Sequence, residues 1–489
     1  MRLLLCSLSL LIGSTSIGYA FCGFFVSGAD ADLYNDASQV VLMRKGNRTV
    51  MSMSNNYKGP TSDFAMVVPV PVVLQEEQVK TLASNVFDKI DKLSAPRLVE
   101  YWEQDPCHVN KFKGVKRKMT KSSARVPRRA AKRVAKDFGV TIEAEFAVGE
   151  YQILILSAKE AQGLEKWLRI NKYNIPEGAS AALAPYIRDE MKFFVAKVNI
   201  KKVKRDPKGV VVLSPLRFDY QSPTLRLPVR LGLLNAQGKQ DLLVYILHPN
   251  ARFEVANYPN VFIPSNLEVE NEVRTQFGNF YTALFDATLA KAGGKAVVTE
   301  YAWQTSSCDP CPVPPLQPND LFVLGGDVLG EGKGPGQLAT GKRPTRKIKR
   351  RRRRPTGGFF GNFSRWVLTR LHTRYSKETL SEDLVFTEAV PVVGGRGNAG
   401  RSTEPPGGVE QSSVNNFQGR YIIRHYWEGE VECQKPVWGR WGGPPRGQKN
   451  ETKAATNLAS AKRDSVKLKT IVRSNLPQLE LPGKGAPKR

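Results

Sequence analysis

The first 20 residues constrain the folding of this chain most, because they decide the compartment in which the other residues fold. Met1 and Arg2 give a short positive start, the residues from Leu3 to Ile12 are almost all apolar, and small residues stand near Ala20. This pattern is typical of a secretory signal peptide cleaved after Ala20. We therefore expect residues 1–20 to be removed and the mature protein to be periplasmic or secreted, where cysteines can pair.

Two other interpretations of the start fit less well. The apolar run is about half of the ~20 residues that a transmembrane helix needs. A lipoprotein signal would need a small residue before its cysteine, whereas the bulky Phe21 precedes Cys22. No later stretch is long and apolar enough to cross a membrane, so we expect no transmembrane segment in the mature chain.

The net charge of +28 is concentrated in three segments. Lys111–Lys136 contains 12 basic residues and no acidic one, Lys342–Arg354 contains ten, and the residues from Arg446 onward are also basic. These segments together carry the whole net charge, so the rest of the chain is close to neutral. Blocks of like charge usually stay disordered and solvated, and they bind anions loosely.

This distribution limits the partners that the chain can have. Phe112 is the one aromatic residue of the first block, which therefore lacks the stacking side chains of single-strand binders. We expect no specific nucleic-acid recognition. Either the segments are solvated insertions, or they adhere to an anionic envelope surface or polysaccharide. The candidate polyanion-binding residues are Arg350, Arg351, Arg352, Arg353 and Arg354.

Strand-like sequence dominates the mature chain. Val40–Arg44 and Arg48–Met53 flank Lys45–Asn47, which predicts a hairpin. Phe64–Val73 is apolar but contains two prolines, which favours an edge or bulged strand over a central one. Further strands are predicted at Tyr151–Leu156, Phe193–Ile200, Val210–Leu213, Leu225–Leu233, Leu242–Leu247 and Phe253–Ala256.

A few helices are interleaved with these strands. Gln75–Leu93 has apolar residues at three- and four-residue spacing, which predicts a helix. The strongest helical pattern is Leu267–Ala292, preceded by a capping box of Ser265 and Glu268. The irregular order of strands and helices predicts an α+β fold with mainly antiparallel strands, disordered basic insertions and a disordered basic tail.

The composition changes along the chain predict seven segments. They are a signal peptide (1–20), an N-terminal strand-rich unit (21–110), a basic insertion (111–137), a central α+β unit (138–324), a disordered Gly-rich and Arg-rich insertion (325–358), C-terminal strands (359–430) and a basic disordered tail (431–489).

Five cysteines remain after the signal peptide is removed: Cys22, Cys107, Cys308, Cys311 and Cys433. Outside the cytoplasm they are expected to pair, and the odd number leaves at least one free. We expect Cys433 to be free, because it lies in the irregular tail. The other four allow three connectivities, which the sequence does not distinguish. We favour a local Cys308–Cys311 bridge and a Cys22–Cys107 bridge.

The Cys308-Asp309-Pro310-Cys311 motif also has the spacing of thiol–disulfide oxidoreductases. That chemistry needs a thiolate at a helix N-terminus. The residues after Cys311 are Pro312-Val313-Pro314-Pro315, which do not open a helix at once. A structural disulfide is therefore favoured over a redox role and over a metal site, because no second Cys or His pair stands at zinc spacing.

No other pattern predicts catalysis. The four histidines form no pair at i and i+4, and no Gly-x-Ser-x-Gly motif is present. Residues 336–343 imitate a phosphate-binding loop but have Arg343 where Ser or Thr is needed. We expect no catalytic residue, cofactor or metal. The function predicted is a non-catalytic binding or structural module stabilised by disulfides. The alternatives are an extracytoplasmic thiol-dependent or hydrolytic enzyme, or a polyanion-binding surface protein.

Several short motifs together resemble one known family. They are Phe21-Cys22-Gly23-Phe24, Phe64-Ala65-Met66-Val67-Val68-Pro69-Val70-Pro71, Asp105-Pro106-Cys107, Cys308-Asp309-Pro310-Cys311-Pro312 and Asn416-Phe417-Gln418-Gly419-Arg420-Tyr421. With these motifs the chain resembles the bacterial domain of unknown function 2330 proteins from about Phe21 to His425. The resemblance implies an exported bacterial envelope protein and brings no established catalytic residues. The basic insertions depart from the family pattern.

Overall fold

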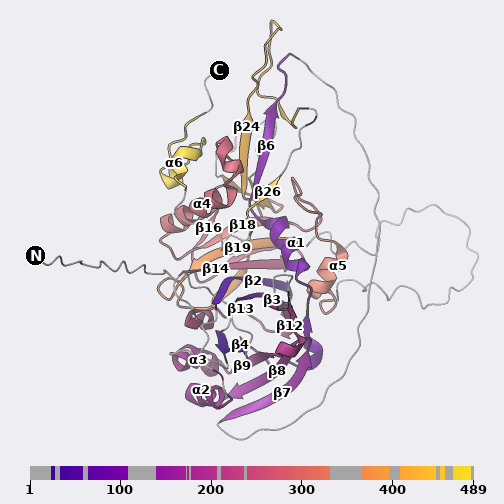
Figure 1. Ribbon diagram of the computed structural model, residues 1–489, viewed down its shortest axis with the longest axis vertical. Helices are drawn as coiled ribbons and strands as arrows, with labels where there is room; N and C mark the ends of the chain where they lie inside the picture. The colour runs from indigo at the N-terminus through magenta and orange to yellow at the C-terminus, as the bar shows by residue number, and fades with distance from the viewer. Residues whose placement is uncertain are drawn as a thin grey trace, which may run out of the picture.

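The structure is a computed structural model (Figure 1). It describes residues 24–27, 34–58, 64–107, 139–171, 173, 175, 178–205, 211–235, 239–330, 366–395, 408–445, 447, 452–456 and 466–485. Within these residues, no helix has the length and apolar character needed to cross a membrane.

An eleven-stranded sheet forms the centre of the molecule, in the order β22-β21-β23-β18-β19-β14-β2-β3-β12-β5, with β16 paired to β18. Its strands are β2 (Tyr34–Lys45), β3 (Arg48–Lys58), β5 (Val79–Thr81), β12 (Leu216–Gln221), β14 (Gln240–His248), β16 (Asn260–Phe262), β18 (Val297–Gln304), β19 (Val367–Tyr375), β21 (Val392–Gly394), β22 (Val409–Gln411) and β23 (Asn416–Gln418). The strands come from segments 21–110, 138–324 and 359–430 alike. The expected hairpin is present as β2 and β3.

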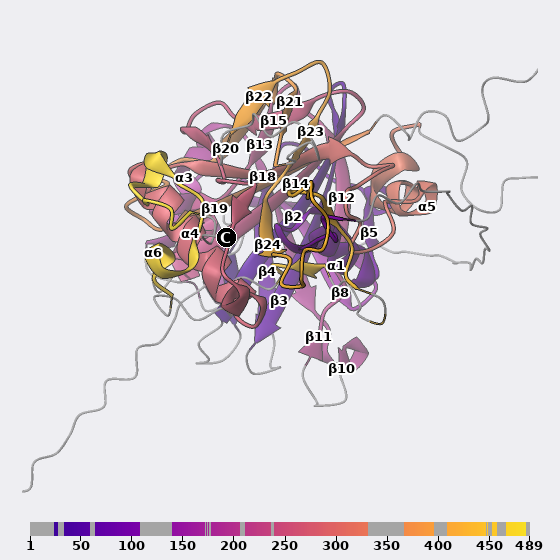
Figure 2. The ribbon, with the colours of Figure 1, turned by 90° about the horizontal axis from the view of Figure 1, so that it is seen from above.

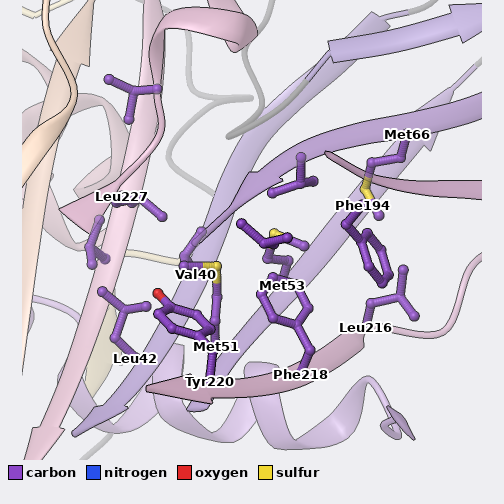
Figure 3. Packing of buried hydrophobic residues seen from close by; sticks show 14 of the residues in the cluster. Val40, Leu42, Met51, Met53, Met66, Phe194, Leu216, Phe218, Tyr220 and Leu227 are labelled. Carbon is purple, nitrogen blue, oxygen red and sulfur yellow. The ribbon is translucent and has the colours of Figure 1, made fainter. Parts of the chain in front are cut away.

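A second sheet packs against one face of the central sheet. It consists of β1 (Phe24–Ser27), β4 (Phe64–Val70), β9 (Lys192–Val198), β8 (Tyr151–Ala158) and β7 (Val140–Val148), all antiparallel. Figure 3 shows Val40 and Met53 of the central sheet near Met66 and Phe194 of the second sheet, in one buried cluster.

Two helices cover the outer face of this second sheet. Because side chains alternate along a strand, Met66 points to the core between the sheets, whereas Val67 packs against α2 (Ala161–Ile170) and α3 (Ala179–Arg188). The opposite face of the central sheet is covered by α1 (Asn85–Ser94), α5 (Pro318–Leu321) and the π-helical turn η5 (Phe322–Gly326). The resulting order of layers is helix, sheet, sheet, helix.

One close approach in these layers requires glycine. Gly325 of η5 has a φ of +154°, and a Cβ atom there would lie 2.8 Å from the Val50 side chain in β3. A larger residue would therefore push η5 away from the central sheet.

A third sheet forms one end of the long axis, opposite the end formed by β7 and β8 (Figure 1). It contains β17 (Leu267–Glu268), β24 (Arg420–His425), β6 (Arg97–Glu103), β25 (Trp441–Gly442) and β26 (Lys453–Ala454). The helices α4 (Phe277–Lys291) and α6 (Leu468–Ile471) pack together beside it, as Figure 2 shows from above. Two small sheets complete the fold, β10 (Lys204–Arg205) with β11 (Val211–Val212), and β13 (Leu225–Leu227) with β20 (Leu384–Ala389) and β15 (Arg252–Val255).

The α+β class with mostly antiparallel strands is confirmed. The strand pairs β2–β14, β6–β24, β17–β24, β16–β18 and β21–β23 are parallel.

Two predicted helices begin later than expected. In the segment Gln75–Leu93, β5 pairs with β12 at the edge of the central sheet, and α1 begins only at Asn85. In the segment Leu267–Ala292, the first residues form β17 and a short 3-10 turn, and α4 begins at Phe277. The expected capping residue Ser265 instead donates to the Gln418 carbonyl oxygen and accepts from the Arg420 amide.

The segment Phe64–Val73 also differs from expectation, because β4 lies inside its sheet and not at an edge. It pairs with β1 on one side and with β9 on the other. Among the described residues, β1 pairs only with residues 64–67 and no second strand lies beside Pro69, which is compatible with a proline there.

Parts of residues 431–489 differ from the expected disordered tail. This segment contributes β25, β26 and α6 to the fold, and Ile471, Val472 and Leu476 are buried beside α4. Apolar residues spaced among the basic ones anchor these parts. The basic segment 111–137, most of 325–358 and Arg350 to Arg354 lie outside the described residues.

Candidate binding groove

A groove of about 790 Å³ lies at the end of the third sheet, where β6 and β24 finish side by side. This volume is within the range typical of ligand sites, and it exceeds two further cavities of about 200 and 220 Å³. The parallel register places His425 opposite Trp102, and their rings stack with centroids 4.5 Å apart. The strand pairing thus fixes the floor of the groove.

Aromatic side chains continue along the chain beyond β24. Tyr426 and Trp427 line the groove together with Trp102. The Tyr426 ring meets the Trp441 ring edge to face, with centroids 5.3 Å apart. The Arg424 guanidinium lies 5.1 Å from the centre of the Trp441 ring, within the range of a cation–π contact.

The carboxylates of Glu103 and Glu268 hold the segment after β24 in place. Glu103 accepts hydrogen bonds from the backbone amides of Trp427, at 3.2 Å, and Gly439, at 2.7 Å. Glu268 accepts from the Tyr426 hydroxyl at 2.8 Å and from Arg424 at 2.7 Å. Burial, followed by this bond to Glu268, raises the pKa of Tyr426 to about 12. These carboxylates therefore serve the structure of the groove.

Two residues of the groove have polar side chains that form no polar contact with the other described residues. The side chains of Asn271 and Glu428 are exposed and line the groove, and neither forms a hydrogen bond or ion pair with any other described residue. By contrast, Arg473 is bound to Glu270 at 2.7 Å.

A disulfide between Cys107 and Cys433 joins the segments that follow β6 and β24, both of which contribute residues to the groove. Their Cα atoms are 5.5 Å apart, although the residues are separated by 326 positions. The expected Cys22–Cys107 bridge and the expected free Cys433 are therefore wrong. Cys107 follows β6 and Cys433 follows β24, so the parallel pairing of these strands brings them together. Cys22 lies outside the described residues.

The second disulfide joins Cys308 and Cys311, with Cα atoms 5.0 Å apart. The loop between them is fixed by two buried side chains: Arg97 donates to the Pro310 carbonyl oxygen and Gln418 to the Asp309 carbonyl oxygen. No helix begins at Cys311, since α5 starts at Pro318. Cys311 itself is exposed.

A cluster of charged side chains lies in the interior of the central sheet, on β18 and β19. Glu300 binds Arg370 at 2.5 Å and His372 at 2.6 Å, and none of the three is more than 1% exposed. Arg370 also binds Asp91 of α1 at 2.5 Å, and His372 binds Asp241 of β14 at 3.2 Å. These groups connect the central sheet to α1.

The charges of this cluster stabilise one another. Burial would raise the pKa of Glu300, but the charges of His372 and Arg370 lower it to about 2. Burial would lower the pKa of His372, but Glu300 and Asp241 outweigh burial and raise it. The Phe285 ring stacks on the His372 ring with centroids 3.8 Å apart, and so helps to exclude water from the pair.

Among known families, one matches most of the chain. The family described as an uncharacterized protein conserved in bacteria, DUF2330, matches residues 17–387. The chain belongs to the DUF2330 family. Neither the curated proteins nor the solved structures contain a significant match to it.

The DUF2330 match covers only part of the residues that line the groove. Trp102 on β6 and the Cys308–Cys311 loop lie inside the matched residues, whereas β24, Trp427 and Cys433 follow its end at residue 387. The groove is thus built where this DUF2330 domain meets the residues that follow it.

Sequence reasoning missed the groove because its lining residues come from four of the predicted segments, 21–110, 138–324, 359–430 and 431–489. One signal was present: Trp427, Trp438 and Trp441, three of the seven tryptophans, stand close together. Among the described residues, no group of three or more His, Cys, Asp or Glu side chains is arranged to hold a metal ion. The structure places Cys107, Cys308 and Cys311 in disulfides, while Arg350–Arg354 lie outside the described residues.

Proposed function

We propose that this DUF2330 protein is an exported, disulfide-stabilised binding module of the bacterial envelope, and that its ligand occupies the groove between β6 and β24. The observation that carries the proposal is a groove of about 790 Å³ lined by aromatic side chains. A disulfide joins two of the segments that supply its lining. A rigid site binds without the loss of entropy that ordering a loop would require.

The two disulfides support export. Disulfides persist in oxidising compartments and are rare in the bacterial cytosol. The apolar start of the chain, followed by Ala20, is consistent with a cleaved signal peptide.

The hydrogen bonds of the wall support binding over catalysis at this groove. Glu103 and Glu268 are each engaged by two donors, so their charge holds backbone amides, Arg424 and Tyr426 in place. Carboxylates used in this way position a surface and do not transfer protons to a ligand.

The experiment measures retention of the purified protein on sedimented envelope fragments of the source bacterium. We expect the wild type to co-sediment and Trp427→Ala to lose most of this retention. Trp438→Ala is the matched control, because Trp438 is an exposed tryptophan of the same segment that does not line the groove. Equal retention of both variants, with unchanged circular dichroism, would contradict the proposal.

One observation favours a second candidate function. The Cys308–Cys311 disulfide is accessible at the exposed Cys311, so a substrate thiolate would be able to attack it and form a mixed disulfide. Turnover in an insulin-reduction assay with dithiothreitol would favour this candidate, and the binding proposal predicts none. Adhesion of the basic segments, including Arg350–Arg354, to an anionic surface or polysaccharide stays a separate prediction.

A further inference from the structure

We propose that the ligand of the groove is an uncharged glycan chain, recognised by stacking of pyranose rings on the aromatic side chains and by hydrogen bonds to the polar ones. This inference rests on the proposed function and names its ligand class. The residues that carry it are Trp102, Trp427, Asn271 and Glu428.

The first step is the shape that the aromatic side chains offer. Each indole is a flat apolar surface of ~150–250 Å² with a negative face. The axial C–H groups of a pyranose form a flat face of partly positive hydrogens, which matches such a ring. Trp102 lies on β6 and Trp427 just after the neighbouring strand β24, and both line the groove. Sugar units along a chain would therefore meet more than one aromatic surface.

The second step is the polar groups between these rings. The planar amide of Asn271 and carboxylate of Glu428 are exposed and have no partner among the described residues. A planar group with two polar atoms can bind two neighbouring hydroxyls of one sugar at once. The hydroxyls around a pyranose ring supply both donors and acceptors for these groups.

The third step is the charge of the lining. Arg424 and Arg473 are both neutralised by carboxylates, Glu268 and Glu270. Glu428 leaves one carboxylate facing the groove. Among the described lining residues a polyanion would find no unpaired cation, so the lining disfavours an anionic glycan.

The fourth step separates a glycan from a proline-rich peptide, which also binds aromatic grooves. Peptide recognition of that kind uses indole N–H groups as donors to the peptide carbonyls. The Trp427 Nε1 atom is buried, and Gly429 covers that edge of the ring, since a Cβ on Gly429 would lie 2.6 Å from Trp427 Cζ2. Trp427 therefore offers its ring and not its donor.

This packing supplies a matched pair of variants. Gly429→Ala would displace the Trp427 ring, because the added methyl group has no room beside it. Gly278→Ala is the control, because Gly278 lies in α4 outside the groove and its Cβ would meet nothing within 4 Å. A second pair tests the carboxylate: Glu428 lines the groove, while Glu430 is exposed in the same segment and does not.

The experiment is isothermal titration of the full mature protein with three soluble probes: maltohexaose, cellohexaose and chitohexaose. We expect binding of at least one of them, weakened about tenfold or more in Trp427→Ala and Gly429→Ala, and clearly weakened in Glu428→Gln. Gly278→Ala and Glu430→Gln should bind like the wild type. Circular dichroism and the thermal midpoint check that each variant is folded.

The outcomes distinguish the two proposals. Failure of all three hexasaccharides overturns the glycan inference, and retained envelope co-sedimentation that depends on Trp427 then leaves the binding proposal standing. Binding of decaproline, lost in Trp427→Ala, would replace the glycan by a peptide. Hexasaccharide binding that Trp427→Ala and Gly429→Ala leave unchanged would place the site outside the groove and contradict both proposals.

Discussion

Glu300 holds two cationic side chains in the interior of the central sheet. Arg370 and His372 are buried with it and each binds one of its carboxylate oxygens. Removing charges from water is unfavourable, and their mutual attraction offsets this only while each charge keeps its partner. The free energy of unfolding should therefore depend strongly on this one carboxylate.

We predict that Glu300→Gln destabilises the fold by about 3–5 kcal/mol, because it leaves two buried cations without their shared counter-charge. Urea titration followed by circular dichroism measures the change. Glu410→Gln, at an exposed carboxylate, is the control and should change the free energy of unfolding by less than about 0.5 kcal/mol. A similar small effect of both substitutions would show that the cluster does not contribute as described.

The same cluster predicts how stability depends on pH. The contribution of Glu300 is present above its ordinary pKa of 4.5 and is lost as the pH falls toward its folded pKa of about 2. The contribution of His372 is complete below its ordinary pKa of 6.5 and is lost as the pH rises through its higher folded pKa. The contribution of this pair to the free energy of unfolding should thus be greatest between pH 4.5 and pH 6.5.

Urea midpoints at about pH 3, 5.5 and 8 measure this dependence. The midpoint should be highest near the middle value, and His372→Gln should flatten the decrease on the alkaline side. A wild-type midpoint that rises steadily from acid to alkaline pH would contradict the assigned charge states.

At the level of elements, the two disulfides constrain the chain very differently. Cys107–Cys433 joins residues separated by 326 positions, and Cys308–Cys311 joins residues separated by three. Cross-linking stabilises mainly by restricting the unfolded chain, and the effect grows with the length of the closed loop.

We predict that the double variant Cys107→Ser/Cys433→Ser loses about 5 kcal/mol of unfolding free energy, and that Cys308→Ser/Cys311→Ser loses about 2 kcal/mol. Denaturant titration of both variants under non-reducing conditions tests the order. The first variant should also lose retention on envelope fragments, because its groove wall is no longer tied to β6. The reverse order of stabilities would argue against the long-range bridge.

The short helix α6 shows that residues late in the chain belong to the core. Ile471 is 2% exposed and packs in the cluster around α4. Ile471→Ala should destabilise by about 2–5 kcal/mol through the cavity that it leaves. Lys469→Ala on the exposed side of the same helix should be nearly neutral in thermal unfolding. Equal midpoints for the two variants would mean that α6 is not docked.

Elements with a strong local pattern could be predicted from the sequence. The hairpin of β2 and β3 has strand-forming residues on both sides of the short turn at Lys45–Asn47, and this pattern depends only on neighbouring residues. The first part of Leu267–Ala292 could not be predicted, because β17 is a strand only through its pairing with β24, more than 150 residues later. Long-range pairing overrode a helical pattern there.

Over the whole molecule, the α+β class followed from the order of elements, whereas the groove did not. Trp102 and Trp427 line one groove because β6 pairs in parallel with β24, which no local pattern encodes. The partner of Cys107 was mispredicted for the same reason. Glu300 carried a weaker signal, as the one charged residue of β18, whereas Arg370 and His372 stand in β19 among several other polar residues.

The most direct test is mass spectrometry of non-reduced peptides from the protein isolated from its source bacterium. We predict a mature N-terminus at Phe21 and a cross-linked peptide pair that contains Cys107 and Cys433. A chain that still begins at Met1, with both cysteines modified by an alkylating agent before reduction, would contradict both export and the disulfide between the two segments that line the groove.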